Sequence, residues 1–456
     1  MREVTPVVAT SLSRPSRPAP PAAAVGGGQR RRILRGMVEA AAEHGYARAS
    51  VARVIERAGV ARGTFYAEFT DREECFGAAY RMEVRGLAEA IEAAVACPEG
   101  ERDPIASVLD AVLRRFAADP AGARLLLVEA FAAPAAIREK HEERIEAFER
   151  RIESFLASRS RVEAPLQLSA CALVGGVGDT IVGRLVQDEA DTLPDMAADL
   201  IAWIDSYRLS PGCSPHPPQH WQRLGGRFPP QPRQVAAKPD LLPRGASALP
   251  AGQAASDRQA RIVEATTRVV SARGYAGSTV ADIGAEARVS KAAFYSHFES
   301  KLDAFLAAQR LNLEGSLAVS AGAFYGADVW PERVWGALIV FLRYIAERPQ
   351  AADLAILEVH AAGETAIKLE RDTRMAYTLF LKEGHLERLQ WGPALPPLCS
   401  EAVAGAINGV LRRHLRTAGA ERVTQLAPQC AYVTLAPFLG PERACEFIHR
   451  RLEAAP

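Results

Sequence analysis

The sequence predicts an all-α protein built from two tandem copies of one unit. Apolar residues recur with helical spacing along most of the chain, as at Leu34, Met37 and Ala41. No segment outside a proline-rich linker shows the sustained alternation that is typical of a strand. The third observation is an internal repeat, and it determines how the chain is divided.

The repeat appears when the sequence is shifted against itself by 229 residues. Arg32–Arg81 then lies over Arg261–Arg310 without a gap, and 16 of the 50 paired positions are identical. The same register continues further on, where Pro120 falls on Pro349. Such self-similarity at one fixed offset indicates a duplication.

Six segments follow from the repeat and the composition. Residues 211–250 hold ten prolines, so this stretch cannot bury a core and is predicted to be a linker. The predicted segments are a disordered tail (1–28), helix-turn-helix domain 1 (29–83), helical regulatory domain 1 (84–208), the linker (209–256), helix-turn-helix domain 2 (257–312) and helical regulatory domain 2 (313–456). We call 29–208 copy 1 and 257–456 copy 2, and the two helix-turn-helix domains head 1 and head 2.

Charge and cysteine content limit the possible functions. The chain has 55 Lys+Arg against 54 Asp+Glu, so any binding to a polyanion must come from local patches. Its seven cysteines form no C-x-x-C pair, which favours reduced thiols in a cytoplasm. No apolar run reaches the roughly 18 residues of a membrane span. We expect a soluble cytoplasmic protein that does not bind a membrane.

Each head contains two short helices joined by a tight turn. In head 1 they are Val51–Ala58 and Arg62–Glu68, and Gly59 ends the first because it readily takes a positive φ. In head 2 they are Val280–Ala287 and Ser290–His297, where the serine can cap its helix. This arrangement predicts a helix-turn-helix, whose second helix can enter a DNA major groove.

Both heads resemble the DNA-binding domain of TetR-family transcriptional regulators. The resemblance rests on SVARVIERAGVARGTFYAEFTDREECF (50–76) and TVADIGAEARVSKAAFYSHFESKLDAF (279–305). It covers about 50 residues per copy closely and the following helices only by layout. It implies that double-stranded DNA is contacted by Ser50, Arg62, Thr64, Tyr66 and Arg72 in head 1, and by Thr279, Ser290, Lys291, Tyr295, His297 and Lys301 in head 2.

The heads depart from the family pattern in different ways. Head 1 has Glu68 where the family has His or Tyr beside a phosphate, and Ala61 in place of a capping serine. Head 2 has Arg288 in place of the turn glycine, which costs stability if it is left-handed. We expect head 2 to be the stronger DNA reader. Arg30–Arg32 are either an arm toward the minor groove or a solvated helix start.

The resemblance also implies a ligand pocket and a dimerisation bundle in each following helical region. The bundle candidates are Leu166–Gln187 with Met196–Arg208, and Cys399–Leu415 with Gln425–Glu453. Candidate pocket residues are Phe116, Phe131, Tyr344 and His360. Glu129 and Glu358 lie in matching apolar runs and either anchor a polar ligand group or make a structural hydrogen bond. The two copies are expected to pair within one chain or through a homodimer.

The sequence therefore predicts a DNA-binding transcriptional regulator, a repressor that a small apolar effector releases and whose unlike heads read unlike half-sites. The alternative is an interaction protein with one or both heads degenerate, which Glu68 favours. No catalytic triad, H-E-x-x-H motif or cofactor loop supports an enzyme, so we expect neither catalysis nor a cofactor. The loose spacing of Cys213, His216 and His220 lacks a fourth ligand, so we expect no metal.

Overall fold

The computed structural model describes residues 22–96, 103–159, 166–209 and 251–453. The secondary structure of these residues consists of helices joined by turns and short loops, with one isolated bridge between Leu166 and Arg208. The predicted all-α fold is confirmed. Most of the predicted tail and linker, and with them Cys213, His216 and His220, lie outside the described residues, and α1 begins at Ala22, within the predicted tail.

The described helices follow the order of the repeat. Copy 1 contains α1 (Ala22–His44), η1 (Tyr46–Arg48), α2 (Val51–Ala58), α3 (Arg62–Glu68), α4 (Arg72–Ala96), α5 (Pro104–Ala118), α6 (Pro120–Arg124), η2 (Leu125–Glu129), α7 (Ala130–Ala132), α8 (Ala135–Arg159), α9 (Ala170–Val186), η3 (Ala190–Met196) and α10 (Ala197–Asp205). Copy 2 contains α12 (Ala251–Gly277), α13 (Val280–Ala287), α14 (Lys291–Tyr295), α15 (Lys301–Phe324), α16 (Trp330–Glu347), α17 (Pro349–Ala352), η4 (Asp353–Leu357), α18 (Glu364–Tyr377), η5 (Thr378–Leu381), α19 (Lys382–Arg388), α20 (Leu398–Ala418), η6 (Ala420–Leu426), α21 (Ala427–Leu439) and α22 (Pro441–Glu453).

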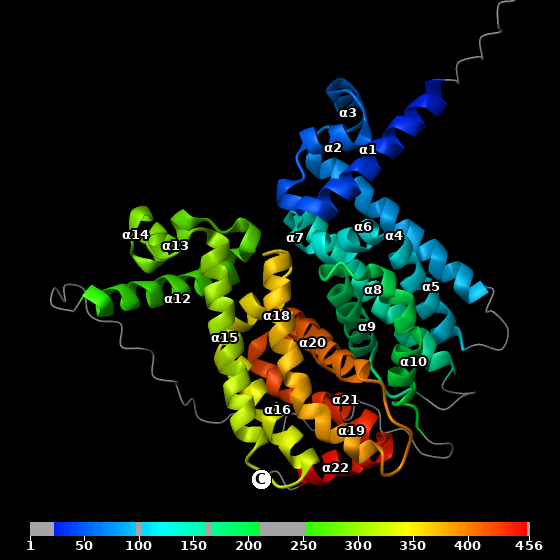
Figure 1. The fold of residues 1–456 in the computed structure, drawn as a ribbon, viewed down its shortest axis with the longest axis vertical. Helices are drawn as coiled ribbons and strands as arrows, with labels where there is room; N and C mark the ends of the chain where they lie inside the picture. The colour runs from blue at the N-terminus through cyan, green and yellow to red at the C-terminus, as the bar shows by residue number, and fades with distance from the viewer. Residues whose placement is uncertain (1–21, 97–102, 160–165, 210–250, 454–456) are drawn as a thin grey trace, which may run out of the picture.

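The two heads lie apart at the periphery, and the regulatory helices of both copies lie between and below them (Figure 1). Each head closes around a pair of phenylalanines one helical turn apart. Phe65 and Phe69 are buried in head 1, and Phe294 and Phe298 are buried in head 2. Helices α4 and α15 then run on from the heads into the regulatory regions, so each head is joined to its regulatory region by one continuous helix.

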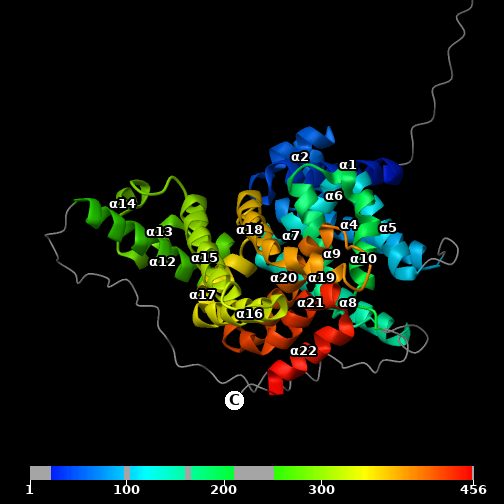
Figure 2. The ribbon, with the colours of Figure 1, turned by 60° about the horizontal axis from the view of Figure 1, so that its bottom comes forward.

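Helix α9 of copy 1 packs along α20 of copy 2, and glycines allow the two backbones to approach closely (Figure 2). A Cβ atom on Gly175 would lie 2.7 Å from the Cα of Gly409. A Cβ atom on Gly405 would lie 2.8 Å from the Cβ of Asp179. Both distances are below van der Waals contact, so this crossing requires residues without a side chain.

Residues that are equivalent in the repeat meet at this interface. Asp179 and Asn408 are 229 positions apart, and the Asn408 Nδ2 donates a hydrogen bond to the Asp179 Oδ2 at 2.9 Å. Phe131 and His360 are equivalent in the same way, and their ring centroids lie 4.9 Å apart. Contacts between equivalent residues are what a two-fold axis produces. The two copies therefore pack as an internal pseudo-dimer.

Helices α10 and α21 both pack against α20, and the segment that follows α10 contacts α21. The buried Tyr207 hydroxyl donates a hydrogen bond to the Val433 carbonyl at 2.7 Å. The final helical region is divided at Gly440, whose φ of 89° ends α21 before α22 begins. Ion pairs between the copies surround the apolar contacts: Arg413–Glu149 at 2.7 Å, Arg416–Glu142 at 3.1 Å and Arg184–Glu401 at 3.5 Å.

Among the described residues, no single helix is both long and apolar enough to cross a bilayer. One sharply bent pair, Pro120–Ala132 with Ala135–Ser158, meets the length and composition criteria only when its two helices are taken together.

Replacing Gly175 with alanine should destabilise the protein by about 1–3 kcal/mol, because the new methyl group would overlap the α20 backbone. Gly178→Ala in the same helix is the matched control. A Cβ there meets nothing within 4 Å, so its effect should range from neutral to a stabilisation of about 1 kcal/mol. Urea unfolding of both variants measures the difference, and equal midpoints would show that the α9–α20 crossing does not depend on this close approach.

Candidate nucleic-acid interface

Local capping interactions define the helix-turn-helix of head 1. Ser50 lies at the N-cap of α2, where its side chain accepts a hydrogen bond from the Arg53 N–H at 3.4 Å. Gly59 ends α2 with φ 60° and ψ 43°, the left-handed conformation that glycine adopts at low cost. Ala61 begins α3 without a side-chain cap. The predicted bounds of both helices agree with the observed ones.

Head 2 compensates for a less favourable turn with stronger caps. Thr279 and Asp282 form a reciprocal capping box at the start of α13. Ser290 caps α14 by accepting a hydrogen bond from the Ala293 N–H at 3.1 Å. Arg288 occupies the turn with φ 56° and ψ 45°, almost the conformation of Gly59 in head 1. A side chain in this conformation costs stability because its Cβ crowds the backbone.

Each second helix presents a tyrosine and a basic residue on its outer face. Tyr66 is 47% exposed and Tyr295 is 49% exposed, although the preceding phenylalanine of each helix is fully buried. Arg62 lies 5.6 Å from the Tyr66 ring centroid, and Lys291 lies 6.0 Å from that of Tyr295. Each head therefore has an aromatic group and a cation beside each other on an exposed face. Such a pair can contact a phosphate and a base edge.

The predicted contact residues divide into two groups by burial. Seven of them are exposed on the heads: Ser50, Arg62, Tyr66, Thr279, Ser290, Lys291 and Tyr295. The other four are partly buried: Thr64, Arg72, His297 and Lys301.

Arg72 and Lys301 make internal contacts that the sequence did not predict. The Arg72 Nη1 donates to the carbonyls of Tyr46 at 3.2 Å and Ala47 at 3.0 Å. The Lys301 Nζ donates to the carbonyls of Tyr275 at 2.6 Å and Ser278 at 2.9 Å. Each cation also lies over the ring of its tyrosine, at 4.5 Å in head 1 and 4.0 Å in head 2. Burial lowers the pKa of Lys301.

The same two tyrosines are held from the opposite side by carboxylates of the regulatory regions. The Tyr46 N–H donates to the Glu129 Oε2 at 2.6 Å, and the Tyr275 N–H donates to the Glu358 Oε2 at 2.7 Å. We call each of these tyrosines, with its carboxylate and its cation, a head corner. Of the two interpretations of Glu129 and Glu358, the structural hydrogen bond is the one that the structure describes. Burial raises the pKa of Glu129 to about 7.

Glu68 is paired with Arg30. The Arg30 Nη1 lies 3.1 Å from the Glu68 Oε2 and also donates to the Glu68 carbonyl at 3.0 Å. The guanidinium lies 4.4 Å from the centroid of the Phe69 ring. The charge that departs from the family pattern thus has a local counter-charge. Arg30 therefore packs within head 1, whereas Arg31 and Arg32 are exposed on α1, and a contact of theirs with a minor groove stays a prediction.

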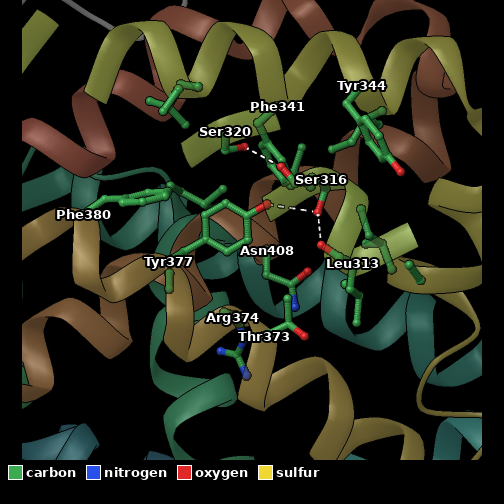
Figure 3. Close-up of a pocket in the computed structure, with 18 of the residues that line it drawn as sticks. Leu313, Ser316, Ser320, Phe341, Tyr344, Thr373, Arg374, Tyr377, Phe380 and Asn408 are labelled. Carbon is green, nitrogen blue, oxygen red and sulfur yellow. Dashed lines mark hydrogen bonds between the residues drawn. The ribbon is translucent and has the colours of Figure 1, made fainter. Parts of the chain in front are cut away.

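Copy 2 also contains an apolar cavity of about 150 Å³ (Figure 3). It lies between α15, α16, α18 and α20, and the Tyr377 hydroxyl donates to the Ser316 Oγ at 3.0 Å on one side of it. Of the predicted pocket residues, Tyr344 lines this cavity. Phe116 is buried in the core on α5, while Phe131 and His360 pack against each other between the copies.

Comparison with known families matches both heads. The family model for bacterial regulatory proteins of the tetR family matches residues 33–79 and 262–308. Two segments in tandem are thus similar to the TetR-type domain, one in each head. The matched ranges contain α2, α3 and the first turns of α4 in copy 1, and α13, α14 and the first turns of α15 in copy 2.

Parts of the chain are similar to individual known proteins. The chain is similar to the HTH-type transcriptional repressor DhaR of Mycobacterium sp. (strain GP1), with 58% identity over 40 residues, 9% of this chain and 20% of the repressor. The similarity therefore spans a fifth of that repressor's length. Among solved structures, the chain is similar to the fatty acid degradation regulator FadR of Bacillus halodurans, with 16% identity, a TM-score of 0.36, and coverage of 39% of this chain and 94% of that one. A tetR-family regulatory protein from Rhodococcus RHA1 has 19% identity, a TM-score of 0.32, and coverage of 43% and 96%.

Replacing Arg288 with glycine should stabilise the second TetR-type domain by about 1 kcal/mol, because glycine relieves the left-handed strain. Gly59→Ala is the reciprocal control and should destabilise the first domain by a similar amount. Urea unfolding of the full chain measures both. An unchanged midpoint for the Arg288→Gly variant would show that the arginine is not strained.

Stability should fall as the pH rises from about 4.5 to about 7, because the folded protein holds a proton on Glu129 that the unfolded chain has lost. The raised pKa contributes its full stabilisation below the unfolded value, and this is lost as the pH passes the folded value. Glu129→Gln should remove this part of the pH dependence, because an amide does not titrate in this range while its oxygen still accepts the Tyr46 N–H. Melting temperatures across this pH range measure the effect, and parallel profiles for the two proteins would contradict it.

Proposed function

We propose that the protein is a DNA-binding transcriptional repressor whose two TetR-type domains read the two unlike half-sites of one operator. The observation that carries this proposal is the presence of two complete helix-turn-helix heads in a single chain whose copies pack as a pseudo-dimer. Proteins of this class need two recognition helices on one operator, which two separate chains usually supply. Here one chain supplies both.

Differences between the exposed faces support unlike half-sites. The second helix of head 1 begins with Arg62, Gly63 and Thr64, whereas that of head 2 begins with Lys291 and two alanines. An arginine can bond two acceptors of a guanine, whereas a lysine acts as a point charge and alanine offers only a small apolar contact. The two faces therefore present different donors to a groove, and each should favour its own sequence.

The cavity in copy 2 supports regulation by a small apolar effector. Apolar cavities with a few polar groups are typical binding sites for small molecules. In this proposal the effector binds copy 2 and favours a conformation in which the heads no longer fit the operator, which releases the DNA.

The alternative, an interaction protein with degenerate heads, depended on Glu68. The pairing of this carboxylate with Arg30 reduces its repulsion of a phosphate, so the observation that favoured the alternative is weakened. We therefore propose that both heads bind DNA through the eleven contact residues identified from the resemblance. The segment boundaries predicted above, with α1 and α12 beginning earlier than predicted at Ala22 and Ala251, belong to the same proposal, as do the absence of catalysis and a cytoplasmic location.

Matched tyrosine variants test the two-headed proposal. Genomic fragments selected by the full-length protein should yield an operator with two protected half-sites about one helical turn apart, bound by one chain. Tyr66→Ala should reduce protection of one half-site and Tyr295→Ala that of the other, each weakening binding by about 10- to 100-fold. Leu386→Ala, at an exposed position outside the heads, is the control.

Two results would contradict this function. Loss of the same half-site in both tyrosine variants would mean that only one head reads DNA. If no fragment were selected even at low salt, DNA binding itself would be contradicted, because phosphate contacts are strongest at low salt.

A further inference from the structure

The charged side chains that line the copy 2 cavity already have charged or aromatic partners. Arg374 lies 3.1 Å from Glu370 and 3.1 Å from Asp179, which also accepts the hydrogen bond from Asn408. The guanidinium of Arg348 lies over the Tyr344 ring at 4.1 Å. An ionised ligand would therefore compete with these existing partners for a counter-charge. The lining favours an uncharged, mainly apolar molecule, and a cavity of this size matches about one aromatic ring.

At four positions equivalent to cavity-lining residues of copy 2, copy 1 carries a larger or a charged side chain. Ala355 and Ser316, which line the cavity, correspond to Leu126 and Leu87 in the repeat. Two further lining residues, Asn312 and Tyr344, correspond to Glu83 and Arg115, which form an ion pair with a distance of 2.8 Å. A buried carboxylate, a guanidinium and two leucines thus occupy the region that in copy 2 borders open space. The two copies differ in their capacity to hold a ligand.

One wall of the cavity is the segment that holds head 2. Ala352, Ala355 and Ile356 face the cavity from α17 and η4. The same short segment carries Asp353, whose Oδ2 accepts the Ser271 hydroxyl at 2.6 Å, and it leads directly to Glu358 of the head 2 corner. Its Asp353–Leu357 turn is π-helical, a form that often marks functional sites within helices.

The cation of the head 2 corner also lies on a helix that lines the cavity. Lys301 is the first residue of α15, and the same helix lines the cavity further along with Leu313, Ser316 and Ser320. Both charged groups that hold Tyr275 therefore lie on elements that a ligand would contact. A shift of either element would move the head 2 corner.

Head 1 is connected differently. The equivalent of Asp353 is Arg124, which makes no matching bond to head 1 but pairs with Glu364 of copy 2 and the Leu185 carbonyl. Glu358 also has a charged neighbour from the other copy, because the Arg138 Nη1 lies 3.6 Å from its Oε1. The position equivalent to Arg138 in copy 2 is Ile367, so this contact has no counterpart at Glu129.

We propose that the cavity of copy 2 binds an uncharged, mainly apolar ring compound and that head 2 alone responds to its occupancy, through α17, η4 and Glu358. Head 1 keeps its conformation while head 2 moves, so the two heads no longer fit one operator together and the DNA is released. This inference rests on the proposed function for its biological meaning, but the coupling inside the protein stands on the geometry just described.

Hydrogen exchange of the full-length protein without DNA tests the coupling. Ala355→Leu installs the side chain of copy 1 in the cavity wall, and it should change amide exchange across residues 274–279 by about threefold or more, with residues 45–50 unchanged. Ser316→Leu, at the facing wall, is the second variant in case the first fails to fold. Glu129→Ala, which removes the acceptor of the Tyr46 N–H, is the matched perturbation of the other corner and should alter residues 45–50 alone.

Calorimetric titration tests the ligand class with probes of matched ring size. Toluene and benzyl alcohol should bind the wild-type protein, whereas benzoate and benzylamine should not. Ala355→Leu should abolish the binding, and adding toluene to the wild-type protein should alter exchange across residues 274–279 only.

Each contrary result overturns a defined part of the proposal. Exchange that changes at both corners, at residues 45–50 alone or at neither corner in the cavity variants would reject control through head 2. Binding of the charged probes, or no binding of the neutral ones, would reject the ligand class. Because no DNA is present, these results do not depend on operator binding. A failed operator selection would instead reject the proposed function while leaving the coupling intact.

Discussion

The close crossing of α9 and α20 is the contact on which the rest of the structure depends. It brings together two regulatory regions that are separated by a long stretch of sequence, and it sets where each head lies relative to the other. Gly175, Gly405 and Gly409 make the approach possible, and the Asp179–Asn408 hydrogen bond lies within it. Because α4 and α15 run continuously from the heads into this core, the position of each head follows from how the core is packed.

The head corners link the orientation of each head to the packing of the regulatory regions. At each corner the backbone N–H of a tyrosine donates to a carboxylate, and its backbone carbonyl accepts from a cation. Both backbone polar groups of the tyrosine are therefore satisfied inside the protein. The carboxylate comes from the regulatory region and the cation from the helix that leaves the head. A relative movement of these two elements must therefore strain or break the corner, which is how a change around the cavity in copy 2 can reach Tyr275.

Sequence reasoning succeeded where a structure is decided by neighbouring residues. The ends of α2, the capping by Ser290 and the buried phenylalanine pairs all follow from local spacing and cap chemistry. It could not assign Glu129 and Glu358 to the head corners, because their partners lie about 83 residues away and only the fold brings them together. The repeat did contain one indication of the cavity. In the alignment of the two copies, the small Ala355 of copy 2 corresponds to the larger Leu126 of copy 1.

Joining two copies in one chain changes what an axis of symmetry permits. In a homodimer, residues on the axis meet their own kind, so an aspartate at position 179 would meet a second aspartate and the two charges would repel. After duplication the equivalent residue can differ, and Asn408 donates a hydrogen bond to Asp179 instead. His360 against Phe131 is a second case, since unlike side chains share one symmetric position. The same freedom allows one copy to retain a cavity while the other fills the corresponding region with an ion pair. The Asp179–Asn408 contact therefore favours pairing of copy 1 with copy 2 over pairing of copy 1 with itself, and one chain can in this way carry two heads that differ.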